Sequence, residues 1–93
     1  MRYKLKYTGE FKKAYKRCVK RHYNMQLLTE VLTVLQENGT LPPKYKPHKL
    51  SGNYSGKWEC HIHPDWLLVW MQDDDELTLL MLQTGTHSDI FGK

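Results

Sequence analysis

The sequence predicts an α+β domain, an antiparallel sheet of element order β-α-α-β-β-β with a helical hairpin packed on one face. Three observations lead to this class. The first seven residues alternate charged and apolar side chains, the next thirty carry apolar residues at helical spacing, and three strand-like runs separated by turn residues follow. The 93 residues, 40% hydrophobic and 26% charged, fit one globular domain spanning residues 1–93.

The N-terminal part is expected to form one strand and two helices. Residues 2–7 have the period-2 pattern of a half-buried strand, and Thr8 suits the N-cap of a helix running to about His22. The inner face of that helix is predicted to hold Phe11, Ala14, Tyr15, Cys18 and Val19. Asn24 suits the cap of a second helix, and Gly39 suits its left-handed end. The predicted inner stripe of this second helix is Leu28, Val31, Leu32 and Leu35.

The C-terminal part is expected to be a three-stranded meander that follows a loop over residues 40–56. The predicted strands are residues 57–63, 66–72 and 76–84. The middle run is apolar at both alternating sets of positions, which is typical of a central strand covered on both faces. Asp73-Asp74-Asp75 predicts a turn, and residues 85–91 are expected to close the chain as a loop or single helical turn.

Composition favours a protein of the cytoplasm. No apolar run approaches the roughly 18 residues of a membrane span. Arg2, Lys4 and Lys6 interrupt any signal-peptide pattern. Cys18 and Cys60 are too few for a disulfide framework or a cysteine-based zinc site, so we expect small core residues in a reducing compartment.

Basic residues gather at the N-terminal end. Residues 1–22 hold nine of the 14 lysines and arginines and one of the ten acidic residues, a net charge of +8, which leaves −4 for the rest. Such polarity favours a polyanionic partner, of which nucleic acid is the obvious one. A solvated helix face is the alternative interpretation.

The stretch His61-Ile62-His63-Pro64-Asp65-Trp66 is the candidate for chemistry. Histidine suits proton transfer near neutral pH, because its reference pKa is about 6.5. In a regular strand His61 and His63 point to the same face, while Cys60 and Ile62 point to the other. The rival is a metal site, since His-x-His followed by Asp65 has ligand-like spacing. We expect no bound metal and no cofactor, and we expect His63 to face solvent.

Three blocks then give the chain a resemblance. They are Lys46-Pro47-His48-Lys49-Leu50, Cys60-His61-Ile62-His63-Pro64-Asp65-Trp66, and Thr84-Gly85-Thr86-His87-Ser88-Asp89-Ile90-Phe91-Gly92. In this order and spacing the chain resembles the RelE/ParE superfamily of bacterial toxins and, within it, the YafQ-like mRNA interferases. The resemblance implies a single RelE-like toxin domain of a type II toxin–antitoxin system. Such toxins enter the ribosomal A site and cut messenger RNA without a metal, and a cognate antitoxin protein blocks them.

The resemblance also implies residue roles. Acid–base work falls to His48, His61, Asp65 and His87, with His87 as the general acid and Asp65, with His48 or His61, on the base side. Trp66 and Phe91 are expected to shape the site or stack on bases. YafQ-like toxins commonly carry an arginine just before the Thr-Gly-Thr-His block, where this chain has Gln83. A neutral amide cannot stabilise the negative charge of a phosphate as an arginine does. We therefore expect either that Lys49 or Lys57 stabilises the phosphate, or that this protein is a slower enzyme.

Two other functions stay open at this level. A non-catalytic toxin of the same fold could inhibit a protein target, as ParE-type toxins are understood to act on gyrase. Those toxins generally lack the histidine set, so His48, His61 and His87 favour the nuclease. An RNA-binding module without catalysis is the other alternative, and Gln83 favours it.

Overall fold

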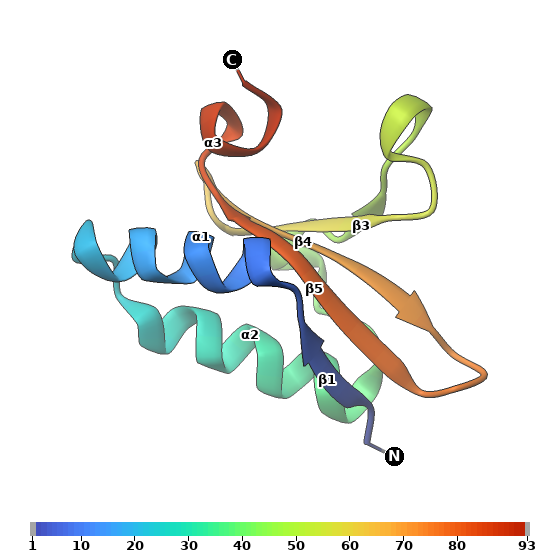
Figure 1. The fold of residues 1–93 in the computed structure, drawn as a ribbon. Helices are drawn as coiled ribbons and strands as arrows, with labels where there is room; N and C mark the ends of the chain where they lie inside the picture. Colours follow the sequence, from blue (N-terminus) through green and yellow to red (C-terminus); the bar gives the residue numbers. More distant parts are fainter. Residues whose placement is uncertain (1, 93) are drawn as a thin grey trace.

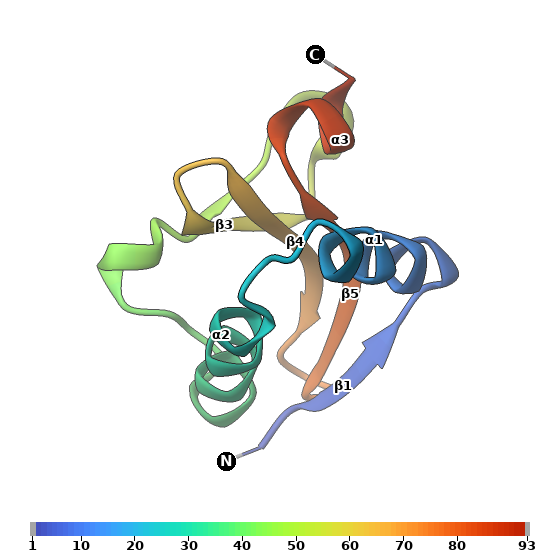
Figure 2. The ribbon, with the colours of Figure 1, turned by 90° about the vertical axis from the view of Figure 1, so that its left-hand side faces the viewer.

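The computed structural model describes residues 2–92 as a five-stranded sheet with helices α1 and α2 on one side (Figures 1 and 2). The short helix α3 and the loop around η2 rise away from α2. The elements are β1 (Lys4–Tyr7), α1 (Gly9–Lys20), α2 (Met25–Asn38), η1 (Pro43–Tyr45), β2 (His48–Lys49), η2 (Gly52–Tyr54), β3 (Trp58–His63), β4 (Trp66–Asp73), β5 (Thr78–Gly85) and α3 (His87–Phe91). The predicted α+β class and the order of its main elements are confirmed.

The sheet has the order β1-β5-β4-β3-β2, and two of its pairings differ from the prediction. Strand β1 runs parallel to β5, whereas the other neighbours are antiparallel. The prediction of an all-antiparallel sheet was therefore wrong at this edge. Residues 40–56 also contain β2, which pairs with β3 by placing His48 opposite Glu59. Alternation along a strand indicates which of its faces is buried, but it does not indicate which strand lies beside it or in which direction that strand runs. Neither pairing could therefore be predicted from the sequence of one strand.

Both long helices begin and end as their capping residues predict. The Thr8 hydroxyl accepts a hydrogen bond from the backbone N–H of Phe11 at 3.0 Å, and the Asn24 side chain accepts one from Gln26 at 3.2 Å. Gly39 ends α2 at φ 69°, a left-handed cap that glycine adopts without strain.

The core lies between the helices and one face of the sheet. Its fully buried residues include Cys18, Leu28, Leu35, Cys60 and Trp70. The buried stripe of α1 is narrower than predicted, because it holds Phe11, Ala14 and Cys18 while Tyr15 and Val19 remain 38% and 47% exposed. On α2, Leu28, Val31 and Leu35 are buried and Leu32 is only partly so.

Strand β4 is covered on both faces, as its apolar sequence predicts. Trp66 to Trp70 are all buried. Leu68 and Trp70 belong to the helix-side core, while Leu67 and Val69 lie outside that cluster, on the opposite face. That opposite face, which we call the open face, carries His61 and Glu59 beside them, because these residues are paired with Leu67 and Val69. None of the helices among residues 2–92 is long and apolar enough to span a bilayer.

Candidate active site

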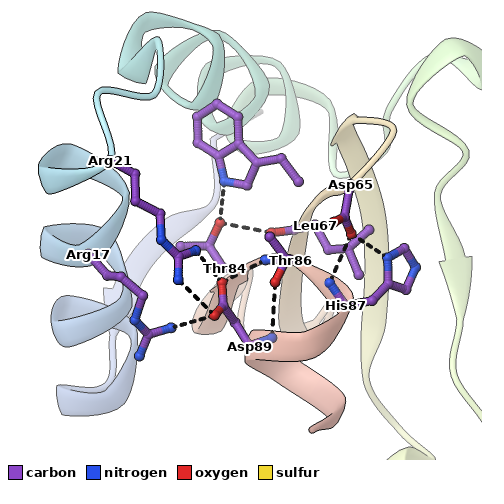
Figure 3. Close-up of polar contacts among 9 residues, drawn as sticks. Arg17, Arg21, Asp65, Leu67, Thr84, Thr86, His87 and Asp89 are labelled. Carbon is purple, nitrogen blue, oxygen red and sulfur yellow. Dashed lines mark hydrogen bonds and ion pairs between the residues drawn. The ribbon is translucent and has the colours of Figure 1, made fainter. Parts of the chain in front are cut away.

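His87 and Asp65 form the first polar pair of the site (Figure 3). The Oδ1 atom of Asp65 accepts hydrogen bonds from the backbone N–H of His87 at 3.0 Å and from its ring Nδ1 at 2.7 Å. These two bonds hold the pKa of the Asp65 carboxyl below its usual range, the backbone bond having the larger effect. Because a carboxylate only accepts, Nδ1 carries a proton and Nε2 is left for a substrate.

His48 and His61 form the second group, around a carboxylate that sequence reasoning missed. Glu59 is 5% exposed, and its Oε1 lies 3.2 Å from Nε2 of His48 and 4.0 Å from Nε2 of His61. The Nδ1 atom of His48 lies 2.8 Å from the carbonyl of Lys46, and the other oxygen of Glu59 has no hydrogen-bond partner among residues 2–92. The alternation Glu59-Cys60-His61 was a signal for it, since it places Glu59 and His61 on one face.

The two groups meet at one end of the open face. Ring centroids of His48 and His61 lie 6.3 Å apart, and those of His61 and His87 lie 6.0 Å apart. Phe91 joins them, with its ring 6.4 Å from that of His87 and edge-on to Tyr54 at 5.0 Å. The side chains of His48 and His87 are about half exposed, so the cluster is open to a ligand. The structure thus brings together His48, His61, Asp65 and His87, with Phe91 beside them.

Two predicted neighbours lie elsewhere. Trp66 is 3% exposed, and its indole N–H donates to the hydroxyl of Thr84, which donates to the carbonyl of Leu67. Its ring meets Tyr23 edge-on at 4.8 Å on the helical side, so Trp66 presents no face on which a base could stack. The register of β3 shifts between His61 and His63. As a result, His63 does not join His61, and it lines a pocket with Tyr23, Asp65 and Trp66.

The two candidate lysines lie on opposite faces. Lys49 is paired with Trp58 and its ammonium lies 5.6 Å from that ring, which stacks on Trp70 of the core. Lys57 instead lines a pocket of the open face with Gln83 and Tyr54. Its ammonium lies 5.3 Å from the Tyr54 ring. The Gln83 amide donates to Glu10 at 2.7 Å, which fixes its orientation in that pocket.

Cysteine and possible metal ligands are the remaining reactive groups of the described residues. Burial raises the pKa of the Cys60 thiol to about 12, so this cysteine stays protonated and inert, as its inward-pointing position predicted. Within residues 2–92, no cluster of three or more His, Cys, Asp or Glu side chains has an arrangement that could hold a metal ion.

Comparison with known proteins agrees with this geometry. A family model described as the bacterial toxin of a type II toxin–antitoxin system, YafQ, matches residues 3–92. The mRNA interferase toxin YafQ of Escherichia coli K12 is 37% identical over 89 residues, which cover 95% of each chain. This chain belongs to the YafQ toxin family. The family resemblance drawn from the sequence, and with it the prediction of a toxin of a toxin–antitoxin system, is confirmed.

Solved structures of similar toxins have the same fold. A crystal structure of the E. coli DinJ–YafQ toxin–antitoxin complex superposes with a TM-score of 0.88 and 35% identity, covering 99% of this chain and 100% of that one. A crystal structure of a metal-bound toxin from Helicobacter pylori gives 0.87 and 36%, covering 96% and 99%. The shared fold therefore extends over the whole described chain.

Proposed function

We propose that this YafQ-family toxin is an mRNA interferase, an endoribonuclease that cuts messenger RNA in the ribosomal A site by metal-free acid–base catalysis. The observation that carries the proposal is the convergence of His48, His61 and His87, from three separate segments, with a carboxylate paired to one of them. The curated relatives are named mRNA interferase toxins, and an mRNA interferase is an endoribonuclease.

The proposed reaction is attack of a ribose 2′-hydroxyl on the adjacent phosphorus. A base removes the hydroxyl proton, and an acid protonates the 5′-oxygen as its bond to phosphorus breaks. His87 suits the acid, because Asp65 holds its Nδ1 proton and stabilises the imidazolium, leaving Nε2 free to donate. Asp65 is therefore assigned as the partner of the acid instead of the base. His61 remains on the base side, next to Glu59, whereas both ring nitrogens of His48 face acceptor oxygens, the carboxylate of Glu59 and the carbonyl of Lys46.

Positive charge near the phosphate is assigned to Lys57. This lysine shares its pocket with Gln83, the position where YafQ-like toxins commonly carry an arginine. The neutral Gln83 amide is already bonded to Glu10, so it supplies no charge. Phe91, beside His87, is the proposed surface for stacking a base.

The proposed partners follow from charge and family. The basic residues of α1 and of the loop around Lys57 would contact ribosomal RNA. The related E. coli toxin is seen in complex with DinJ, which supports a cognate antitoxin protein for this chain. Because the proposed substrate is messenger RNA on translating ribosomes, the proposed site of action is the bacterial cytoplasm.

The test is in vitro translation of a defined message with the purified protein, followed by mapping of new 5′ ends. The proposal expects cuts at codon intervals in translated messages and none in the same RNA without ribosomes. Cutting should persist with 1,10-phenanthroline, which removes zinc and copper but leaves the ribosomal magnesium; this arm is needed because one relative is a metal-bound toxin. Blocked translation with intact message, by folded protein, would instead favour a non-catalytic RNA-binding toxin.

A further inference from the structure

The carboxylate of Asp89 joins α3 to the first helix, and no role for it follows from the cluster described above. The side chain of Asp89 is 13% exposed. Its two oxygens accept a bidentate pair from Arg21, at 2.6 Å from Nη1 and 3.1 Å from Nη2. Arg17 approaches the same carboxylate at 3.7 Å. Hydrogen bonding to Arg21 holds the pKa of Asp89 far below its usual range, so the carboxylate stays charged.

The same carboxylate also fixes the start of α3. It accepts the backbone N–H of Thr86 at 2.9 Å, while the Thr86 hydroxyl accepts the N–H of Asp89 at 3.1 Å, a reciprocal capping box. Gly85 makes this fold-back possible, because a Cβ there would lie 2.7 Å from Oδ2 of Asp89 and the residue has φ +144°. The arrangement is therefore built around the Asp89 side chain.

His87 depends on this arrangement because α3 is only five residues long. An isolated helix of that length is unstable in water, so its position must come from contacts with the rest of the fold. Figure 3 shows the Asp89 carboxylate facing α1 on one side of α3, while the His87 ring faces Asp65 on the other. Asp89 thus lies two residues from the imidazole and does not contact it.

We propose that Asp89 is a positioning residue for His87, held by Arg21 and Arg17 so that the imidazole meets Asp65 and points its free nitrogen at the substrate. The bidentate arginine fork sets the rotation of α3 about its own axis, which a single capping bond does not do. This inference rests on the proposed role of His87 as the general acid.

The decisive variant is Asp89→Asn, which keeps an oxygen to accept the Thr86 N–H but removes the charge that binds Arg21. Glu37→Gln is its matched control, because it makes the same carboxylate-to-amide change in the exposed Arg2–Glu37 ion pair, away from α3. Two readouts are needed. One is the split of kcat against KM for cleavage on programmed ribosomes, and the other is the 15N chemical shift of the His87 ring nitrogens by NMR.

We expect Asp89→Asn to lower kcat about tenfold with KM within about twofold, and to move the His87 Nδ1 resonance toward that of a solvated histidine. Arg21→Gln should reproduce the NMR change, and the double variant should add nothing further. An unchanged His87 resonance in folded Asp89→Asn protein would overturn the inference, as would a moved resonance with wild-type kcat. If instead His87→Ala cuts at the wild-type rate, the proposed function fails, and the NMR arm still reports whether Asp89 orients the ring.

Discussion

The two faces of the sheet are built from the same strands, yet one stabilises the fold and the other carries the candidate site. On the helical face, the polar groups close on one another: the Trp66 indole bonds to Thr84, which bonds to the carbonyl of Leu67. On the open face, the side chains of His48 and His87 stay about half exposed, and the Nε2 atom of His87 is left available. Trp66 thus belongs to a layer that stabilises the fold, and His87 belongs to a layer that is open to a substrate. The comparison predicts that substitutions on the helical face lower the free energy of unfolding, and that substitutions on the open face lower the cleavage rate.

The largest effect is expected on the open face. Changing His87 to alanine should lower the cleavage rate about 10² to 10⁴-fold, since it removes the proposed acid. Ribosome affinity and the free energy of unfolding should change little, because the ring is half exposed. Ser88→Ala, at the next exposed position of α3, is the control and should cut normally. Equal loss of rate in both variants would mean that α3 itself, and not the imidazole, matters.

A substitution on the helical face should have the converse effect. Trp66→Phe removes the indole donor and leaves Thr84 without that bond, which should cost about 1 to 3 kcal/mol in the free energy of unfolding. The cleavage rate of the folded fraction should stay within about twofold. Urea denaturation and single-turnover kinetics on the same samples measure both. A large loss of rate without loss of stability would return Trp66 to the role of stacking on a base.

Lys57 and Lys49 allow a direct comparison of the two faces, because one lysine lies on each. Lys57→Ala should lower the rate about tenfold, roughly 1.4 kcal/mol of barrier, because Lys57 lies in the pocket of Gln83. Lys49→Ala is matched in charge and chemistry but lies over Trp58 on the other face, so it should change the rate less than twofold. Restoring an arginine with Gln83→Arg should then rescue Lys57→Ala. A stronger effect at Lys49 would mean that the phosphate approaches from the helical face.

The smallest effect concerns pH and the Asp65–His87 pair. The pKa of Asp65 is lowered in the folded protein by its bonds to His87. Its contribution to stability is therefore complete above the ordinary carboxyl pKa of about 3.9 and is lost as pH falls through the lowered value. NMR of the His87 ring should show the Nδ1 bond intact at pH 5 and released only well into the acid range. Release already between pH 6 and 5 would show that Asp65 does not hold the ring.

The sequence predicts the parts of this molecule that local chemistry decides. Thr8, Asn24 and Gly39 marked the helix ends because capping depends on neighbouring backbone groups. It did not predict the parallel partner of β1 or the shift in β3 that separates His63 from His61, since both depend on pairing between distant segments. Trp66 was expected to shape the site or stack on bases, but strand alternation stops at the turn of Pro64 and Asp65, and its ring packs against Tyr23 on the helical side.

Glu59 and Asp89 show the limit for the site itself. Alternation within β3 places Glu59 beside His61, but its contact with His48 of β2 and the contact of Asp89 with Arg21 of α1 appear only in the folded chain. The histidines could be assigned because three motif blocks carried a family resemblance. Asp65 was assigned in the same way, whereas Glu59 lies outside those blocks and Asp89 lies in the third block without an assigned role.

The most direct test of the account is a single-turnover assay on ribosomes with a defined codon in the A site. Wild type, His87→Ala and Trp66→Phe are compared side by side, with the folded fraction measured in each sample. The account predicts rapid cutting by wild type and by folded Trp66→Phe, and almost none by His87→Ala. Cutting by His87→Ala at the wild-type rate would contradict it, because the open-face imidazoles would then not carry the reaction.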